Sequence, residues 1–427
     1  MKFFFPDSQD LVDPTFDFAT ERRFAHRVRH RDDLYAHEVF EQRVCDGLLV
    51  SKGIVDGLSG GAGKYSMAQR HRLLRVGATE FFRLNRPDRP ILETMGDCGA
   101  FTYVREKVPP YTVDEVLQFY TDCDFDSGIS VDHVILDYQP RWDAGAVEAV
   151  PAAVTERQEI TLDLAAQFLR KCSGSKLRIN PLGVAQGWSP KSYAHSVTQL
   201  QDMGYRYIAV GGMVPLRTND ILTILSAIND VRRSETRLHL LGITRTDVFA
   251  DFERFGAVSF DSTSPLRQAF KDDKNNYYAP ERSYTAIRVP QVEGNADLQK
   301  RIRAGSVNQP NARRLEQRCL ELLTKYDRSE AQLDLVLSAL DEYEAVHSPG
   351  KSFAGTNRDT LEAMPWKSCR CEICRSLGIH VVLFRGAERN RRRGFHNLFV
   401  FYQQLQRTGI SGHGDRVHSM PATVLVQ

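Results

Sequence analysis

Three cysteines near the end of the chain have the spacing of a metal site. Cys369, Cys371 and Cys374 form a Cys-x-Cys-x2-Cys pattern, which places three soft thiolate ligands within one tight turn. The other cysteines are scattered singly, which is not the pattern of a disulfide framework. His380 and His396 are both candidates for a fourth ligand. Three cysteines and one histidine would close the coordination shell, so the pattern predicts a structural zinc ion (Zn2+) rather than a catalytic one.

Carboxylates follow two of the short apolar runs in the chain. Asp97 lies in the group Gly96-Asp97-Cys98-Gly99, and Asp261 directly follows the run Ala257–Phe260. A carboxylate can act as a nucleophile or exchange protons, depending on its surroundings. A lone aspartate at such a place is more often a structural ion-pair partner. The two aspartates therefore indicate chemistry only if the fold brings them together.

The elements that would position these residues are short strands and longer helices in alternation. Amphipathic stretches lie between apolar runs, as at Thr112–Tyr120, Val154–Lys171, Tyr193–Met203 and Thr218–Arg232. Eight runs read as strands buried on both faces. They are Lys2–Phe5, Gly47–Val50, Ile91–Met95, His133–Leu136, Lys176–Ile179, Tyr207–Val210, Leu238–Leu241 and Ala257–Phe260. This order predicts an α/β fold, the (β/α)8 TIM barrel, with a doubly wound open sheet as the alternative.

Polar or glycine-rich groups follow the later strands closely. These groups are Gly96–Gly99, Asp137, Gln186-Gly187, Gly211-Gly212 and Asp261. Barrel active sites are built at the carboxyl ends of the strands, so these groups are expected to converge at one mouth.

The character of the chain changes beyond Pro265, where a polar stretch without clear period begins. We expect a barrel catalytic core over 1–268, followed by a polar excursion and helical insertion over 269–350. Two helices are predicted inside that insertion, at Arg313–Tyr326 and Glu330–Ala345. Residues 351–427 are expected to form a late zinc-binding subdomain with a C-terminal helix.

The composition is that of an ordinary globular protein. Hydrophobic residues make up 42% and charged residues 26% of the 427 residues, and the net charge is only +2. Nucleic acid would therefore be bound through local basic runs, such as 22–31 or 389–393, rather than by bulk charge. No apolar run approaches the roughly 20 residues that cross a bilayer. The apolar start of the chain is cut short by Pro6 and Asp7. A cytoplasmic protein without a membrane partner is expected.

The chain resembles the tRNA-guanine transglycosylase superfamily, which has a (β/α)8 barrel with a zinc subdomain inserted late. The zinc pattern of that superfamily ends in His-Asn-Leu, and His396-Asn397-Leu398 matches it, so the resemblance selects His396 as the fourth ligand. Its other motifs are matched in order between about residues 90 and 400. The matches are Asp97–Phe101, Gln186-Gly187, Gly211-Gly212-Met213, Leu240–Gly242 and Asp261–Arg267.

The resemblance implies roles for the matched residues. Asp261 would be the nucleophile of a covalent glycosyl-enzyme intermediate, and Asp97 would move protons to and from the departing and incoming bases. Two displacements would retain the anomeric configuration. The implied substrate-binding residues are Asp137, Gln186, Gly212 and Met213 at the purine edge, Phe101 and Leu241 on its faces, and Arg267 at phosphate.

Three departures from the tRNA enzymes make the chain most similar to the DNA-acting branch of the superfamily, the DNA 7-deazaguanine transglycosylases. Cys98–Thr102 replaces Ser-Gly-Gly-Phe-Gln, Trp188 follows Gln186-Gly187, and no Arg-Asn-rich stretch follows Arg267. The implied partners are double-stranded DNA, a 7-deazaguanine base (preQ0) and accessory ATPase or helicase-type proteins. A target guanine would have to leave the stack. Arg267, Arg282 and Arg391–Arg393 are the expected phosphate contacts.

Three other interpretations stay open at this point. The first is a tRNA-guanine transglycosylase with the same mechanism and a different polymer. The second is a non-catalytic barrel that only binds nucleic acid or supports a partner; the presence of both Asp97 and Asp261 counts against it. The third is a zinc-dependent hydrolase, which needs an open coordination position that four protein ligands do not leave.

Overall fold

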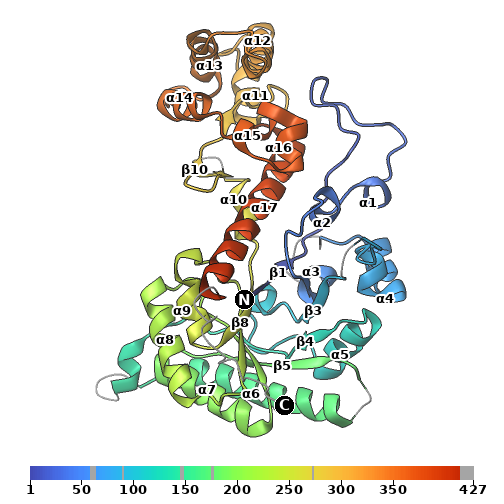
Figure 1. Cartoon of the computed structure of the whole chain (residues 1–427), viewed down its shortest axis with the longest axis vertical. Coiled ribbons are helices and arrows are strands. Elements are labelled where there is room, and N and C mark those ends of the chain that lie inside the picture. The colour runs from blue at the N-terminus through green and yellow to red at the C-terminus, as the bar shows by residue number, and fades with distance from the viewer. Residues whose placement is uncertain (58–63, 89–90, 145–148, 175–176, 272–273, 414–427) are drawn as a thin grey trace, which may run out of the picture. The chain divides into compact units, whose positions relative to one another are not determined.

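A computed structural model of the chain describes residues 1–57, 64–88, 91–144, 149–174, 177–271 and 274–413 (Figure 1). Its contacts divide the chain into two compact units. The barrel unit comprises Met1–Gln9, Cys45–Thr263 and the residues from Leu405 onward. The second unit comprises Asp10–Val44 and Ser264–Gln404.

Eight parallel strands close into a barrel, which confirms the predicted (β/α)8 architecture. The strands are β1 (Lys2–Pro6), β2 (Gly47–Ser51), β3 (Glu93–Asp97), β4 (Ser127–Ile129), β5 (Asn180–Ala185), β6 (Tyr207–Val210), β7 (Arg237–Leu240) and β8 (Ala257–Asp261). The first and last strands pair, with Phe3 opposite Phe260. That pairing removes both sheet edges, so the doubly wound open sheet is excluded.

Helices follow the strands of the barrel unit, and residues that favour helix ends stand at several of their ends. They are α3 (Lys52–Asp56), α4 (Met67–Phe81), α5 (Val113–Asp122), α6 (Ala152–Gly174), α7 (Pro190–Met203), α8 (Thr218–Val231) and α9 (Phe249–Arg254). Thr112 begins α5 with a capping box, because its hydroxyl accepts from the Glu115 N–H and the Glu115 carboxylate accepts from Thr112. Gly204 ends α7 at a φ of 109°, a conformation that favours glycine. Nowhere in the described ranges is a helix both long and apolar enough to cross a lipid bilayer.

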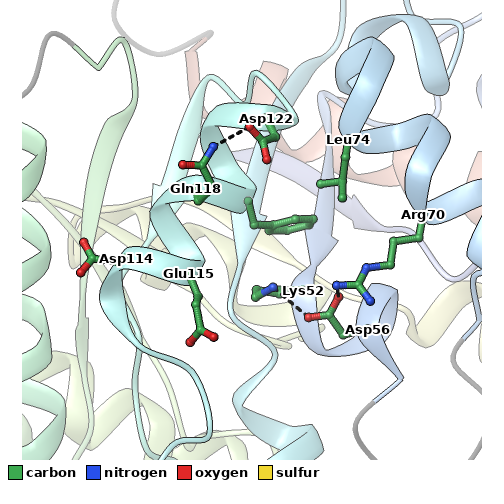
Figure 2. A pocket seen from close by; sticks show the side chains of 9 residues that line it. Lys52, Asp56, Arg70, Leu74, Asp114, Glu115, Gln118 and Asp122 are labelled. Carbon is green, nitrogen blue, oxygen red and sulfur yellow. Dashed lines mark hydrogen bonds and ion pairs between the residues drawn. The ribbon is translucent and has the colours of Figure 1, made fainter.

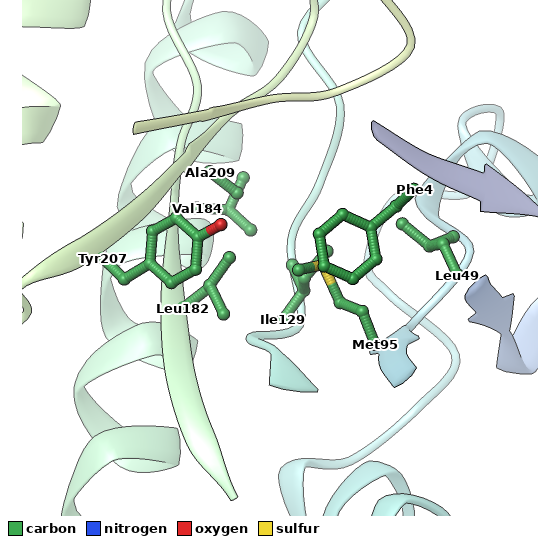
Figure 3. Packing of buried hydrophobic residues seen from close by; sticks show 8 residues of the cluster. All are labelled: Phe4, Leu49, Met95, Ile129, Leu182, Val184, Tyr207 and Ala209. Carbon is green, nitrogen blue, oxygen red and sulfur yellow. The ribbon is translucent and has the colours of Figure 1, made fainter. Parts of the chain in front are cut away.

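The interior of the barrel is filled by side chains from six of its strands (Figure 3). The buried cluster consists of Phe4, Leu49, Met95, Ile129, Leu182, Val184, Tyr207 and Ala209. Burying each large apolar side chain of this kind stabilises the fold by roughly 1.5–3 kcal/mol. The packed interior leaves the strand ends as the place where polar groups can gather.

The predicted positions of two strands are wrong. The run His133–Leu136 was expected to be a strand, but β4 is Ser127–Ile129. A strand was also expected at 176–179, but β5 begins after it, at Asn180. Lys176 lies outside the described residues. Strand β4 was misplaced because a helix side chain packs closely on the sheet there. A Cβ at Gly128 would lie 2.6 Å from the Tyr120 ring, so β4 carries glycine where an apolar side chain would have marked the strand.

The second unit is mostly helical. Its helices are α1 (Arg29–Asp32), α2 (Ala36–Val39), α10 (Ser264–Gln268), α11 (Ala296–Arg303), α12 (Gln309–Asp327), α13 (Leu333–His347), α14 (Ala354–Ala363), α15 (Pro365–Ser368), α16 (Glu372–Leu377) and most of α17 (Gly386–His413). Helices α12 and α13 correspond to the two predicted at Arg313–Tyr326 and Glu330–Ala345. The polar excursion was expected to be irregular, but it also contains α11 and three two-residue strands, β9 (Tyr277–Tyr278), β10 (Ser283–Tyr284) and β11 (Ile287–Arg288).

The segment Asp10–Val44 packs with the second unit, although the predicted barrel core over 1–268 included it. Buried ion pairs hold it there. Arg385 Nε donates to Glu21 Oε1 at 2.7 Å, and Arg385 Nη2 donates to Glu21 Oε2 at 2.8 Å. Ion pairs between residues so far apart in the chain leave no local pattern, which is why the boundary could not be read from the sequence.

Candidate active site and metal centre

Three carboxylates gather at the carboxyl ends of the barrel strands. Asp97 is the last residue of β3, Asp261 is the last residue of β8, and Asp132 lies three residues beyond β4. Burial, together with the negative charges of Asp132 and Asp261, raises the pKa of Asp97 to about 7, against a hydrogen bond from Ser51 that lowers it. Asp97 is therefore both protonated and ionised in comparable amounts near neutral pH, as a proton-transfer group requires.

Asp132 is held inside a buried hydrogen-bond network. Gln186 Nε2 donates to Asp132 Oδ2 at 2.7 Å, and the Cys98 thiol donates to Oδ1 at 3.2 Å. The Tyr103 hydroxyl lies 3.1 Å from both Cys98 Sγ and the backbone oxygen of Asp132. Burial raises the pKa of Asp132 to about 6. Cys98 thus has a definite task in this chain, the orientation of a neighbouring carboxylate.

The two glycines after β6 leave room for Gln186. A Cβ at Gly211 would lie 2.3 Å from Gln186 Nε2, and a Cβ at Gly212 would lie 2.6 Å from the backbone oxygen of Ile135. Gly212 also has a φ of 76°, which other residues rarely adopt. The Tyr193 hydroxyl donates to Gly211 O at 2.8 Å and fixes the turn. The backbone of this turn can therefore approach a ligand closely.

Asp261 is oriented by two donors that act on the same oxygen. The Gly242 N–H lies 3.0 Å from Asp261 Oδ1, and His239 Nε2 lies 3.2 Å from it. The side chain is buried, with 8% of the residue exposed. The Gly242 N–H donates to this oxygen, and the two contacts on Oδ1 together fix the direction of the second oxygen.

The structure places the predicted substrate-binding residues unequally. Gln186 and Gly212 belong to the network around Asp132. Met213, the residue after Gly212, is fully buried. Phe101 is 52% exposed, and Leu241 is half-buried directly after β7.

Two of the predicted substrate-binding residues lie elsewhere. Asp137 is exposed and follows no strand, because β4 ends at Ile129. Its predicted position at a strand end is therefore wrong. Arg267 is exposed on α10, within the second unit.

Several residues of the site were missed by the sequence interpretation, and a signal existed for some of them. Asp132 and His133 interrupt the apolar stretch from Ile129 to Leu136, and His239 stands in the middle of β7. A polar side chain within a buried run needs a partner, because burial without a hydrogen bond is costly. Ser51 and Tyr103 carry no comparable signal.

Two arginines of the basic cluster Arg391–Arg393, Arg392 and Arg393, are buried and so are not available as the predicted phosphate contacts, whereas Arg391 is partly exposed. Arg392 Nη1 pairs with Glu388 Oε2 at 3.0 Å, and Arg393 is fully buried. Arg393 Nη2 donates to the backbone oxygen of Ala269 at 2.6 Å. These guanidinium groups satisfy internal acceptors because one face of α17 is buried, a fact that the charge run alone does not show.

One surface hollow of the barrel unit plays no part in this site. It has a volume of about 480 Å³ and lies among α3, α4 and α5 (Figure 2). Asp56 stands between Lys52 and Arg70, at 2.8 Å from Lys52 Nζ and 3.0 Å from Arg70 Nη2. Lys52 and Arg70 thus both pair with Asp56, and among the described residues that line the hollow none is a strand-end carboxylate.

The predicted metal ligands come together in the second unit. The ligand atoms of Cys369, Cys371, Cys374 and His396 all lie within 4.8 Å of one another. His396 Nδ1 is 3.6, 3.5 and 3.3 Å from the three sulfur atoms in chain order. Tetrahedral zinc with its usual bond lengths separates sulfur from nitrogen by about 3.6 Å. The four residues can therefore hold a metal ion, and all four positions of a tetrahedral site are filled by protein.

The surroundings of His396 prepare it as a ligand. Its Nε2–H donates to the backbone oxygen of Tyr278 at 2.7 Å, which leaves the lone pair of Nδ1 directed at the thiolates. The Tyr277 ring stacks on the imidazole at 4.1 Å. His380 takes no part in the cluster, since its imidazole lies against Phe18 and Arg389.

The fold and these two centres define a closed (β/α)8 barrel with buried carboxylates at its strand ends and a late cysteine–histidine subdomain. No family model matches the chain. A curated DNA-guanine transglycosylase of Salmonella montevideo is 52% identical over 412 residues, which are 96% of this chain and 97% of that relative. The chain belongs to the DNA-guanine transglycosylase family.

Proposed function

We propose that this protein replaces guanine in DNA with a 7-deazaguanine base, preQ0, through a covalent aspartyl-glycosyl intermediate. The observation that carries the proposal is the different treatment of two neighbouring carboxylates. Asp261 is held by two N–H donors on Oδ1, whereas burial and like charge raise the pKa of Asp97 to about 7. Environments that separate two carboxylates in this way assign one as nucleophile and the other as acid.

The reaction would proceed in two displacements. Oδ2 of Asp261 forms a bond to the anomeric carbon of the deoxyribose, the glycosidic C–N bond breaks, and its electron pair leaves with guanine. Asp97 gives its proton to the departing purine. Asp97 then takes a proton from the incoming base, whose ring nitrogen attacks the same carbon and releases Asp261. Two inversions at one carbon retain its configuration.

In this proposal Asp132, and not Asp137, recognises the edge of the purine. Asp132 is 3% exposed and bonded to Gln186, whereas Asp137 is exposed. Together with the backbone of Gly212 and Met213, the pair offers donors and acceptors to the edge of guanine. Phe101 and Leu241 would lie against the faces of the ring, since an exposed aromatic side chain is suited to stacking.

Replacing Asp132 with Asn should weaken recognition of the base. The asparagine amide has a single oxygen and an NH2 group in place of the other, so the buried donors of Cys98 and Gln186 would compete with the purine for one acceptor. We expect kcat/KM for base exchange to fall roughly tenfold to a hundredfold, the cost of one unsatisfied buried group. Asp137→Asn is the matched control and should stay within about twofold. A larger loss from Asp137→Asn would return the purine-reading role to Asp137.

DNA would contact the protein through arginines outside the strand-end network. Arg267 is exposed, and Arg282 is exposed and paired with Asp359 at 2.7 Å, a pair that phosphate can displace. Flipping a guanine out of a duplex costs a few kcal/mol. Accessory ATPase or helicase-type proteins that open the duplex would lower this cost. The zinc ion would brace the second unit, held by Cys369, Cys371, Cys374 and His396.

The nature of the polymer and the base can be tested together. The purified protein would be incubated with preQ0 and either plasmid DNA or tRNA, and the nucleosides would be analysed by mass spectrometry. A 7-deazaguanine deoxynucleoside in the DNA is the expected product. Incorporation into tRNA alone would favour the tRNA enzyme. If neither polymer incorporated preQ0 and neither released guanine, the result would favour a barrel that only binds nucleic acid.

The raised pKa of Asp97 predicts a stability gain in an Asp97→Asn variant at alkaline pH. In the unfolded chain this carboxyl ionises near pH 4, whereas in the folded protein its pKa is about 7. The folded state therefore binds an extra proton between these values, and the wild type loses stability as pH rises through them. Asparagine does not ionise, and three pKa units correspond to about 4 kcal/mol, so the variant should be more stable than wild type by about that amount at pH 8 and not at pH 4.

Thermal melts of both proteins at pH 4 and pH 8 measure this difference. Asp230 is exposed on α8 and gives a matched control, because Asp230→Asn should not change the pH dependence. An Asp97→Asn variant that is less stable than wild type at pH 8 would show that the ionised carboxylate stabilises the fold, contrary to the argument.

A further inference from the structure

A chain of hydrogen bonds runs from the barrel interior to Asp261. His239 of β7 is fully buried, and its Nδ1 lies 2.6 Å from Ser259 Oγ while its Nε2 lies 3.2 Å from Asp261 Oδ1. Ser259 is also fully buried and hydrogen-bonds the hydroxyl of Tyr207. The chain Tyr207–Ser259–His239–Asp261 thus links three adjacent strands, β6, β7 and β8.

The members of this chain can donate one to the next, in the direction that ends at the carboxylate. Burial raises the pKa of Tyr207, so the phenol keeps its proton and can donate to Ser259 Oγ. In this direction the Ser259 hydroxyl donates to His239 Nδ1, and the imidazole carries a proton on Nε2. That proton points at Asp261 Oδ1, the charged group that the imidazole contacts. The neighbouring side chain on β1 is Phe4, whose ring meets the imidazole edge-on at 5.9 Å.

We propose that His239 is a positioning residue for the nucleophile, held in its Nε2–H tautomer by Ser259 and Tyr207. The inference rests on the proposed function, in which Asp261 attacks the sugar. With the Gly242 N–H on the same oxygen, two donors fix Oδ1 and direct Oδ2 toward the reacting carbon. A misplacement of a reacting group by about 1 Å can slow a reaction about a hundredfold.

Packing alone does not explain these residue types. The rest of the barrel interior is filled mainly by apolar side chains such as Met95 and Leu182. A buried imidazole and a buried hydroxyl cost stability unless they are hydrogen-bonded, and an aliphatic pair would fill the same space without that requirement. Polar groups at these two positions are consistent with a task performed at Asp261.

Two amide substitutions separate the role of Nε2 from that of the ring. The amide nitrogen of glutamine can take the place of His239 Nε2, whereas that of asparagine reaches only the place of Nδ1, next to Ser259. We expect His239→Gln to slow the formation of the covalent adduct about tenfold, and His239→Asn to slow it a hundredfold or more. Melting temperatures of the two variants should be lowered alike. Equal rate losses that follow the loss of stability would overturn the proposal.

The tautomer of His239 can be observed without any activity. In protein with 15N-labelled histidine, the spectrum of His239→Gln identifies the signal of His239 by its absence. We expect a protonated Nε2 and a bare Nδ1 in wild type, and a mixture of tautomers in Ser259→Ala. A protonated Nδ1 in wild type would overturn the proposal. If the wild-type protein formed no adduct with DNA, the proposed function would fail, while the spectrum would still decide the state of the hydrogen-bond chain.

Discussion

Replacing Asp261 with Asn is expected to abolish base exchange, with a loss of at least about 10⁴-fold in kcat. An amide is a poor nucleophile, and in this variant its nitrogen takes the place of the attacking Oδ2. Its oxygen can still accept from the Gly242 N–H and from His239 Nε2, as Asp261 Oδ1 does. The substitution therefore removes the chemistry and keeps the local hydrogen bonds, so the variant should fold and melt close to wild type.

The covalent adduct provides the direct measurement. DNA incubated with wild-type protein and then denatured should show a protein-linked band, and Asp261→Asn should show none. Asp230→Asn, an exposed change of the same chemistry on α8, should give a full band. A band that persists in Asp261→Asn would move the nucleophile to another residue, with Asp97 the next carboxylate to replace.

The barrel was predictable because strands buried on both faces produce short apolar runs, and six of the eight predicted runs overlap the observed strands. The strand β4 escaped because Gly128 makes room for Tyr120. Its displacement moved the expected carboxylate from Asp132 to Asp137. A shift of a few residues in one strand thus changed the assignment of a site residue while leaving the fold class correct.

The relations between side chains were beyond the sequence. Asp97 and Asp261 stand at strand ends and were found by position, but the donors that distinguish them come from β2, β7 and the turn after β7. Which side chains make such contacts depends on where each side chain points in the folded protein. The arginines of α17 make the same point, since Arg392 and Arg393 are buried although their sequence is that of a charged surface.

The three cysteines of the candidate metal site were found by their spacing because they lie close together in the sequence, whereas His396 was selected by the resemblance. Removing one of these ligands tests the stability of the second unit. Cys371→Ser is expected to lose the bound metal and to destabilise the protein by several kcal/mol, since binding free energy at a closed zinc site is also folding free energy. Cys371 is fully buried among the ligands. Loss of the metal would leave two thiolates and His396 without the ion that they bind in common. Metal content and thermal melting measure both effects.

The matched control for this change is a second buried cysteine of the same unit. Cys319 lies on α12 and donates to the backbone oxygen of Ala339 at 3.1 Å, a bond that serine can also make. Cys319→Ser should keep its metal and lose little stability. Because the four ligands fill a tetrahedral site, no position remains for substrate, so a chelator should unfold the second unit rather than inhibit a folded enzyme. A metal-free protein that melts like wild type and still exchanges bases would contradict the structural role.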